Sequence, residues 1–506
     1  MKKINIIALL ISALSLASCA EYLNINQDPS NPQVAEGFVL LPPILQNMVR
    51  GEAFDSRFAG QYVQNWANSG GGDSWDRHGY ISGSDAGGEK WSIHYFRGGK
   101  NIDLIIKDAE EKEKWDYSGV AKAIRAWSWQ STTDYTGEMI LKQAWEPNRY
   151  IFDFDSQEDI YKEVERLSQD ALTDLNRTDG AVSAVSLGRG DQVYRGDRTK
   201  WIKFVNAILA RNAHHLSNKA SYNPDKVIGF VDKALASNAD NFNVPHDGTS
   251  TADANFFGPL RNNMASFRQT NFAVNLMNGI VFNGVADPRL PLIYTASPDG
   301  IFRGVIPPFG DPNNVVGNAR RIPTLWGALP AAAGQTITTG KNVFQDRANH
   351  PIITFAELQF IKAEAAFRKG DTATALASYR RGIDANMDWN GVAAADKNTY
   401  LASRAVAQTT AALTMSDIMQ QKYIAMIGHG CLETWVDMRR FAYNPAIYTG
   451  LILPSGSNLF ADNGGKPVQR VRPRFNSEYV WNRASLDKVG GNNADYHTQE
   501  MWFTKP

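Results

Sequence analysis

Apolar residues recur at helical spacing in several parts of the chain. The segments 102–109, 160–175 and 201–216 each carry apolar residues three and four positions apart, which is the spacing of one face of an α-helix. The second of these segments follows Ser156 and has acidic residues in its first turn, as is typical of a helix start. The pattern therefore predicts three amphipathic helices in the N-terminal half of the chain.

The helical pattern returns at Thr354 and is interrupted at residues 370–371, where Gly-Asp indicates a turn before a second apolar run at 375–383. This arrangement predicts an antiparallel helix pair, with several alanines that allow close packing. The pair is similar to a tetratricopeptide repeat, although a full consensus is absent and a simple helical hairpin is the alternative. Helices within 101–175 and 414–441 are candidates for further pairs.

Two long stretches lack helical periodicity. Residues 240–350 and 451–506 are rich in Gly, Pro, Asn and Asp. Long stretches without regular structure inside a folded chain are more often functional than connective. We therefore expect the loop-rich insertion at about 240–350 to carry ligand-facing loops.

The N-terminus has the three parts of a bacterial export signal. Two lysines precede an apolar run at 6–16, and small residues lead to Cys19. The run is shorter than the roughly 20 residues that a membrane-spanning helix needs, so it indicates a signal peptide, residues 1–18. The tetrapeptide Leu-Ala-Ser-Cys resembles a lipobox, which predicts lipidation of Cys19 and a lipid anchor. An ordinary signal peptide with a chance cysteine is the alternative.

Beyond the signal, residues 19–36 are polar and form the expected lipidated tether, and 37–506 form a single expected domain. Cys431 is the one other cysteine, so we expect no intrachain disulfide once Cys19 carries lipid. Its apolar neighbours predict a buried, unreactive thiol. Burial of a large core must then stabilise the domain.

The composition narrows the ligand classes. The 52 basic and 52 acidic side chains balance, which argues against nucleic acid as a partner and against a strongly anionic membrane surface. The chain has 13 Trp, 18 Tyr and 24 Phe. Most aromatic residues lie in cores, but a surplus of Trp also suits a carbohydrate binder, because sugar C–H faces stack on indole rings.

Sequence motifs for catalysis are absent. We find no G-x-x-x-x-G-K-[ST] loop, no H-E-x-x-H and no G-x-S-x-G. His214 and His215 are adjacent, so on a helix they diverge by about 100°, and we expect two structural histidines with satisfied partners. A glycosidase needs only two carboxylates, which spacing cannot test. The segment 311–314 (Asp-Pro-Asn-Asn) offers oxygen ligands for a structural calcium, although a plain turn is favoured, and no other cofactor is expected.

Four residues are candidates for ligand contact. Trp75 and Tyr80 lie in a Gly/Ser/Asp-rich loop, and Trp326 lies in the Pro/Gly-containing segment 322–330. Arg303 can supply charge-assisted hydrogen bonds. Packing in the core is the alternative for each aromatic residue. Three other tryptophans lie in or beside helical patterns and are assigned to the core: Trp91, Trp127 and Trp201.

Nine segments in the same order resemble the SusD/RagB outer-membrane lipoproteins of Bacteroidetes. They are 23–32 (LNINQDPSNP), 134–137 (DYTG), 154–161 (FDSQEDIY), 196–197 with Trp201, 286–290 (ADPRL), 354–357 with 363–365, 421–424 (QKYI), 433–435 with 439–440, and 472–475 (RPRF). The tail departs from the family pattern, because 475–478 lacks the proline that often precedes the terminal acidic residue. Each segment is a weak match alone, but their common order is specific.

The resemblance implies a mostly α-helical SusD-like fold with long irregular ligand-facing loops. It also implies a non-enzymatic lipoprotein of the outer membrane, exposed at the cell surface, that binds a nutrient oligosaccharide. Such a protein covers a SusC-like TonB-dependent transporter as a lid and delivers the ligand to it. Micromolar or weaker binding is expected. Two alternatives are the same architecture with an oligopeptide ligand, and a surface-anchored glycosidase.

Several matched residues also have a physical interpretation. Glu357 and Glu364 are seven positions apart on one helix face, where Arg439 or Arg440 can pair with them. Trp435 and Arg439 are spaced for a cation–π contact within one helix. These residues are therefore predicted to hold the fold together and not to bind ligand.

Overall fold

The computed structural model describes residues 35–329 and 340–506. The expected signal peptide, the lipidation of Cys19 and nearly all of the tether 19–36 lie outside the described residues. Within the described ranges the fold is mostly α-helical, as predicted, and its strands are short. None of the helices described there is long and apolar enough to cross a membrane.

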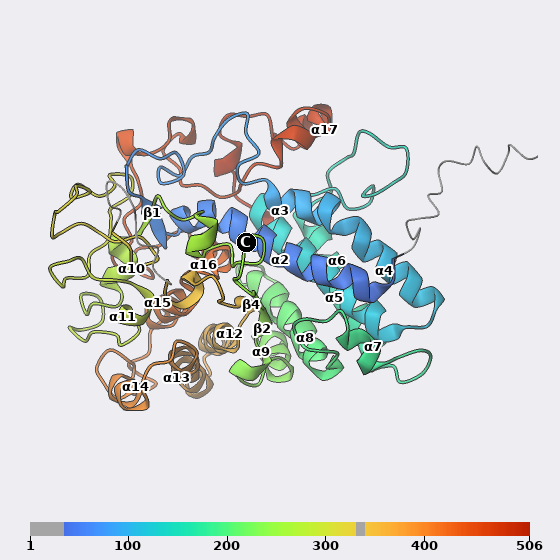
Figure 1. Cartoon of the computed structure of the whole chain (residues 1–506), viewed down its shortest axis with the longest axis horizontal. Coiled ribbons are helices and arrows are strands. Elements are labelled where there is room, and N and C mark those ends of the chain that lie inside the picture. The colour runs from blue at the N-terminus through green and yellow to red at the C-terminus, as the bar shows by residue number, and fades with distance from the viewer. Residues whose placement is uncertain (1–34, 330–339) are drawn as a thin grey trace, which may run out of the picture.

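Seven helices pack one against the next in a continuous array (Figure 1). In order they are α4 (Gly99–Glu111), α5 (Trp115–Thr136), α6 (Gln157–Asn176), α8 (Arg198–His215), α9 (Pro224–Lys233), α12 (Phe355–Lys369) and α13 (Thr372–Trp389). The three amphipathic helices predicted from apolar spacing are present as α4, α6 and α8. A helix packed on both sides buries two faces, which is the general arrangement of stacked helix-pair proteins.

Side-chain caps begin the predicted helices where the sequence indicated. The Ser156 hydroxyl accepts a hydrogen bond from the backbone N–H of Asp159 at the start of α6. Thr354 does the same for α12, which ends at Gly370 with a left-handed backbone (φ 86°). Because only a two-residue turn separates α12 from α13, the two helices form the predicted antiparallel pair. Their tetratricopeptide-like character stays a prediction.

The longest described helix, α2 (Gly37–Tyr62), runs across this array (Figure 1) and contacts α3, α4 and α16. It was not predicted, because Pro42 and Pro43 lie within its first two turns and proline is typical of helix breaks. The remaining helices of the second half are α14 (Ala394–Leu401), α15 (Met415–Met426) and α16 (Cys431–Arg440). Every residue of α16 is buried.

The loop-rich insertion is closed at its base by two strands. β2 (Phe242–Val244) pairs antiparallel with β4 (His350–Ile353), so the chain leaves and re-enters the helical array at one place. Further along, β3 (Phe267–Gln269) pairs with β1 (Trp66–Asn68), which fixes the insertion to the loop that follows α2. Helices in the insertion are short: η2 (Asn238–Asp240), η3 (Pro259–Arg261), α10 (Asn271–Asn275), α11 (Leu290–Ile293) and η4 (Asn342–Phe344).

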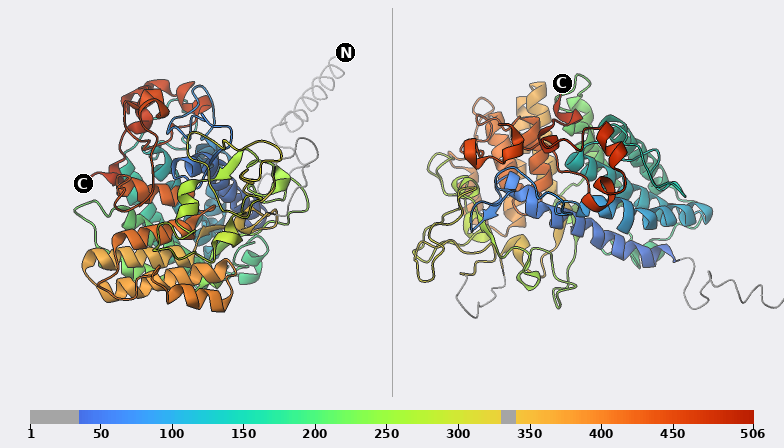
Figure 2. Two further views of the ribbon diagram at one scale, coloured as in Figure 1. Left: turned by 90° about the vertical axis from the view of Figure 1, so that its left-hand side faces the viewer. Right: turned by 90° about the horizontal axis from the view of Figure 1, so that it is seen from above.

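The C-terminal tail is also irregular. It contains η5 (Gly456–Asn458), η6 (Ala461–Asn463), η7 (Phe475–Tyr479), α17 (Arg483–Lys488), η8 (Tyr496–Thr498) and η9 (Trp502–Thr504). Three short helices lie elsewhere in the chain: α3 (Glu89–Ser92), η1 (Ile93–Arg97) and α7 (Ala184–Gly188). The tail lies beside the loop between β1 and α3, as Figure 2 shows from above.

The buried apolar residues form two main clusters. One lies among α2, α4, α5, α6 and α8, and the other joins α12, α13, α15 and α16 to the insertion. Trp91, Trp127 and Trp201 are buried in the first cluster, as predicted. Cys431 is free and buried, and burial raises the pKa of its thiol, which fits the predicted unreactive cysteine.

Candidate functional site: a pocket outside the buried charge network

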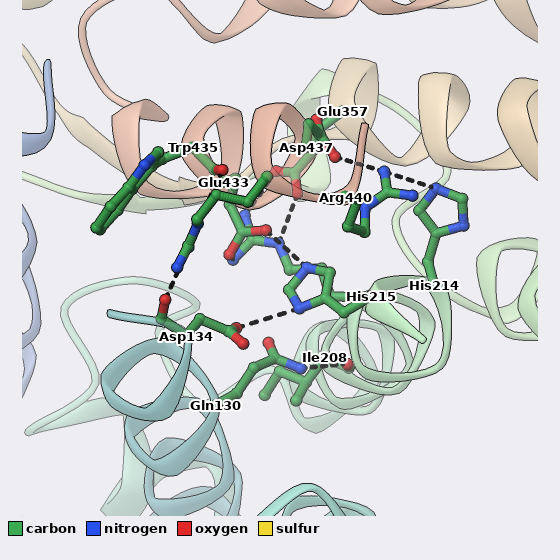
Figure 3. A network of polar contacts seen from close by, with 12 residues as sticks. Gln130, Asp134, Ile208, His214, His215, Glu357, Glu433, Trp435, Asp437 and Arg440 are labelled. Atoms are coloured by element: carbon green, nitrogen blue, oxygen red, sulfur yellow. Dashed lines mark hydrogen bonds and ion pairs between the residues drawn. The ribbon is translucent and has the colours of Figure 1, made fainter. Parts of the chain in front are cut away.

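A network of charged side chains lies where α5, α8, α12 and α16 meet (Figure 3). His215 is at its centre: Nδ1 lies 3.1 Å from a carboxylate oxygen of Asp134, and Nε2 lies 3.0 Å from one of Glu433. Burial by itself lowers the pKa of His215, but the two carboxylates outweigh burial and raise it to about 9. The ring is therefore an imidazolium held between two carboxylates.

The second part of the network surrounds α12. Arg440 lies 2.7 Å from Glu364, and the neighbouring His214 lies 2.8 Å from the same carboxylate. This confirms the predicted pairing of Glu364 with an arginine of the 439–440 pair. Glu357 differs, because its partner is Arg211 on α8, at 2.5 Å.

Arg439 forms the predicted cation–π contact, with its guanidinium carbon 3.9 Å from the centre of the Trp435 ring. It also donates hydrogen bonds to the backbone carbonyls of Asp134 (2.7 Å) and Gln469 (2.8 Å). A single buried side chain thus connects α16 with the end of α5 and with the C-terminal tail. These contacts confirm the structural role that was predicted for Trp435 and Arg439.

The side chains of this network have a structural role: they hold the helices together. Asp134, His215 and Glu433 are the one group in the described part of the chain with metal-ligating atoms close enough to share an ion. Both nitrogens of His215 already face carboxylates, and the Tyr161 hydroxyl donates to Asp134. All are buried. His214 and His215 are therefore structural histidines with satisfied partners, as predicted.

The segment 311–314 forms a turn. One carboxylate oxygen of Asp311 accepts the backbone N–H of Asn313 (2.9 Å), and the other accepts that of Ile322 (3.0 Å). The amide oxygen of Asn314 accepts from Arg321 (2.9 Å). These hydrogen bonds form the turn that the sequence favoured.

The candidate site is a pocket of about 360 Å³ between two segments that are distant in sequence. One wall is the loop 75–88, which joins β1 to α3, and the other is the tail segment 470–497. We call it the loop–tail pocket. Its aromatic residues are Tyr62, Trp75, Tyr80, Phe475 and Tyr479, and its basic residues are Arg470, Arg472, Arg474, Arg483 and His497.

Local hydrogen bonds shape the first wall. The carboxylate of Asp76 accepts the backbone N–H of Asn68 (2.9 Å), and the Tyr62 hydroxyl donates to the carbonyl of Gly79 (2.6 Å). Gly87 has a positive φ of 81°, and a Cβ there would lie 2.9 Å from the Trp75 ring. A glycine is therefore required for the loop to return so closely over the tryptophan.

The second wall is built on η7, which places Phe475 and Tyr479 on one face. Their rings stack with centroids 5.6 Å apart and an interplanar angle of 14°. Arg472 lies between the two walls: it donates to the Tyr479 hydroxyl (3.1 Å), and its guanidinium carbon is 4.1 Å from the centre of the Tyr80 ring. It also donates to the carbonyls of Gly491 (3.1 Å) and Asn493 (2.7 Å), which orders the end of the tail.

A polar clasp joins the two walls. Arg474 lies 2.7 Å from the Asp85 carboxylate, which also accepts the backbone N–H of Asn476 (2.9 Å). Tyr80 donates its hydroxyl to Asp462 (3.0 Å). Burial is the largest cause that raises the pKa of the Tyr80 hydroxyl, so this group remains a hydrogen-bond donor at neutral pH.

The structure brings two of the four sequence candidates into this pocket. Tyr80 is half-buried in its wall, and Trp75 is 2% exposed at its base, packed 4.4 Å from the Phe58 ring. Their contact with a ligand stays a prediction. Phe475 and Tyr479 were not among the candidates, although the segment 472–475 had been noted as a matched motif.

The other two candidates lie elsewhere. Trp326 is 5% exposed and belongs to the core of the insertion, where its indole N–H donates to the carbonyl of Phe257 (2.6 Å). This burial fits the core alternative, and contact of the Trp326 ring with a ligand stays a prediction, as it does for Trp75. Arg303 lies 2.6 Å from Asp299 on a surface turn and is outside the pocket lining.

A second hollow of about 650 Å³ lies between α2 and the insertion. Phe256 and His246 are the rings in its lining, and Arg50 there already pairs with Glu89 at 2.6 Å. It offers less aromatic surface than the loop–tail pocket, which is therefore the stronger candidate.

Comparison with known proteins decides the family. A family model described as "Starch-binding associating with outer membrane" (SusD-like_2) matches residues 29–452. The chain belongs to the SusD-like family. This confirms the resemblance noted in the sequence. No curated protein matches the chain.

Solved structures with the SusD-like fold cover most of the chain. A SusD/RagB family protein from Bacteroides thetaiotaomicron is similar over 93% of this chain and 99% of its own, with 21% identity and a TM-score of 0.69. A chitin-binding SusD homolog from Flavobacterium johnsoniae covers 92% and 98%, with 19% identity and a TM-score of 0.68. A SusD homolog from Parabacteroides distasonis has 19% identity and a TM-score of 0.68 over 93% and 98%. At these identities the likeness establishes the fold.

Proposed function

We propose that this SusD-like protein is a cell-surface lipoprotein that binds a nutrient oligosaccharide and delivers it to a SusC-like TonB-dependent transporter. The observation that carries the proposal is the aromatic character of the loop–tail pocket, where Tyr80 faces a wall containing the stacked Phe475 and Tyr479. A sugar ring offers C–H faces to aromatic rings and hydroxyls to polar groups, and this pocket presents both.

Binding without catalysis fits the lining. Glycoside hydrolysis needs two carboxyl groups on either side of the scissile bond, and no Asp or Glu lines the described loop–tail pocket. The carboxylates of the buried network are paired with cations and remote from solvent. These features support a binding protein over the glycosidase alternative.

The membrane association rests on sequence and family. The predicted lipid on Cys19 and the expected tether 19–36 support attachment at the outer membrane, and the matching family model is described as associating with that membrane. A lid held by such a tether closes over the transporter and opens again without leaving the membrane. The chitin-binding homolog with the same fold supports a glycan as the ligand class.

An oligopeptide is the second candidate ligand. The arginines of the pocket suit a peptide carboxylate, because guanidinium groups bind carboxylates through paired hydrogen bonds. The same side chains hydrogen-bond sugar hydroxyls, so a direct comparison of the two ligand classes is needed.

Calorimetry with panels of oligosaccharides and oligopeptides separates these functions when reducing-end release is measured on the same samples. We expect oligosaccharide binding in the micromolar range or weaker, no sugar release, and loss of binding in Tyr80→Ala. Tyr150→Ala is the matched control, because Tyr150 is 82% exposed and outside the pocket. Peptide binding alone, or sugar release, contradicts the proposal.

Purification of the lipoprotein from native membranes tests delivery. We expect a large outer-membrane barrel to copurify with the wild-type chain. If the chain is recovered alone under mild detergent extraction, the proposed transporter partnership is contradicted while ligand binding stands.

A further inference from the structure

The charge balance of the loop–tail pocket differs from that of the chain. The whole sequence is neutral, yet the pocket is lined by four arginines and one histidine, with no carboxylate among the described lining residues. Two arginines are neutralised from outside the lining: Arg474 by Asp85 at 2.7 Å, and Arg470 by an ion pair with Glu138. The other two, Arg472 and Arg483, determine the electrostatics of the pocket.

Arg472 has no carboxylate partner in the described part of the chain. Its guanidinium donates to the backbone carbonyls of Gly491, Asn493 and Ala494 and to the Tyr479 hydroxyl, and it lies over the Tyr80 ring. Neutral acceptors hold the group in place and leave its positive charge uncompensated.

Arg483 is exposed at the pocket edge, on the first turn of α17. Its side chain forms no ion pair or hydrogen bond within the ranges that the structure describes, so its donors are available to a ligand. Arg472 and Arg483 together leave the pocket with an excess of positive charge beside stacked aromatic rings.

We propose that the ligand is an anionic oligosaccharide, one that carries carboxylate or sulfate groups. This inference rests on the proposed glycan-binding function and names the substrate class of that same pocket. The aromatic wall of Phe475 and Tyr479 stacks on a sugar ring, and Arg483 donates charge-assisted hydrogen bonds to its acidic substituent. The uncompensated charge of Arg472, whose terminal donors are held by the protein, attracts the same substituent through space. A charged pocket of this kind also speeds the encounter with an anionic ligand at low ionic strength.

The test uses defined probes with the full mature chain: tetragalacturonate, a heparin-derived tetrasaccharide and neutral galacto- and cello-tetraose, each titrated at low and high NaCl. We expect an acidic tetrasaccharide to bind about tenfold tighter than either neutral one at low salt, and most of that preference to disappear at high salt, because salt screens exposed charge. Arg483→Gln should weaken binding of the acidic sugar several-fold without changing binding of neutral sugars.

Arg404→Gln is the matched control, since Arg404 is an exposed arginine outside the pocket lining. Tighter binding of neutral tetrasaccharides, or acidic binding that Arg483→Gln leaves unchanged, overturns this inference and leaves the glycan-binding function standing. If neither class of sugar binds, the proposed function itself is contradicted, so the two failures are distinguishable.

Discussion

In the helical array, buried cations and carboxylates contact one another directly, whereas two of the four arginines of the loop–tail pocket have no carboxylate partner among the described residues. His215, Glu364 and Arg440 each face an opposite charge inside the protein. Arg472 and Arg483 do not. Charge that is satisfied internally can only hold helices together, while charge left without a counter-ion is available to a ligand. The two regions thus divide stability and recognition between them.

Removing the central cation of the network should have the largest effect. In His215→Gln, Asp134 and Glu433 remain buried without their shared partner, and we expect a loss of about 3–5 kcal/mol in the free energy of unfolding. Urea denaturation followed by circular dichroism measures it. Lys162→Gln is the control, because its pair with Glu158 is exposed and such surface pairs contribute little to stability. Equal losses in the two variants would contradict the comparison.

Trp326→Ala should cost nearly as much, about 3–5 kcal/mol, since a buried indole is replaced by a cavity. Oligosaccharide affinity should stay unchanged in the protein that remains folded. Trp481→Ala provides the contrast, because Trp481 is 75% exposed and its removal should scarcely change the melting temperature. Selective loss of binding in Trp326→Ala, without loss of stability, would return this residue to the ligand site.

Alkaline pH should weaken the helical region through His215. Its folded-state pKa is raised to about 9 above the ordinary value near 6.5, so its contribution is complete below about pH 6.5 and is lost as pH rises through 9. The full contribution is about 3 kcal/mol. Urea unfolding of wild type and His215→Gln between neutral and alkaline pH measures the difference, which should shrink as pH rises. A constant difference would show that the imidazolium is not the stabilising species.

The pocket wall should show the smallest stability effect. Tyr479→Ala removes the stack on Phe475 and the hydrogen bond to Gly491, and we expect a cost of about 1 kcal/mol in stability with at least tenfold weaker oligosaccharide binding. Val480→Ala is the neighbouring control, half-exposed and outside the pocket lining. Unfolding comparable to that of Trp326→Ala would mean that the wall belongs to the scaffold.

Helices could be predicted from the sequence most clearly where one face is buried and the opposite face is exposed to solvent. That condition holds for α4 and α6, whose apolar spacing was visible in the sequence. α8 was predicted from its apolar spacing as well, although residues 204–212 are buried on all sides. The condition fails for α2, whose two prolines interrupt the first turns and whose second half is buried almost all round. Helical periodicity in a sequence reports the difference between an apolar and a polar face. A helix with no such difference is therefore hard to recognise.

The pocket was predictable in part. The Gly/Ser/Asp-rich loop indicated Trp75 and Tyr80, but its opposite wall lies almost at the other end of the chain, and no local pattern shows that the two segments meet. Trp326 lies in a comparable loop, yet its indole N–H points inward and donates to the carbonyl of Phe257. The direction of a loop side chain depends on such tertiary hydrogen bonds.

The clasp between Asp85 and Arg474 has a consequence for engineering. Asp85 lies in the loop 75–88 and Arg474 in the tail segment 470–497, so this ion pair makes the two walls of the pocket depend on each other. Grafting the loop 75–88 from a relative with another preference should succeed only when the partner tail segment, with its matching clasp residue, is transferred with it. Ligand specificity in this fold would then be determined jointly by the loop 75–88 and the tail segment, which must change together.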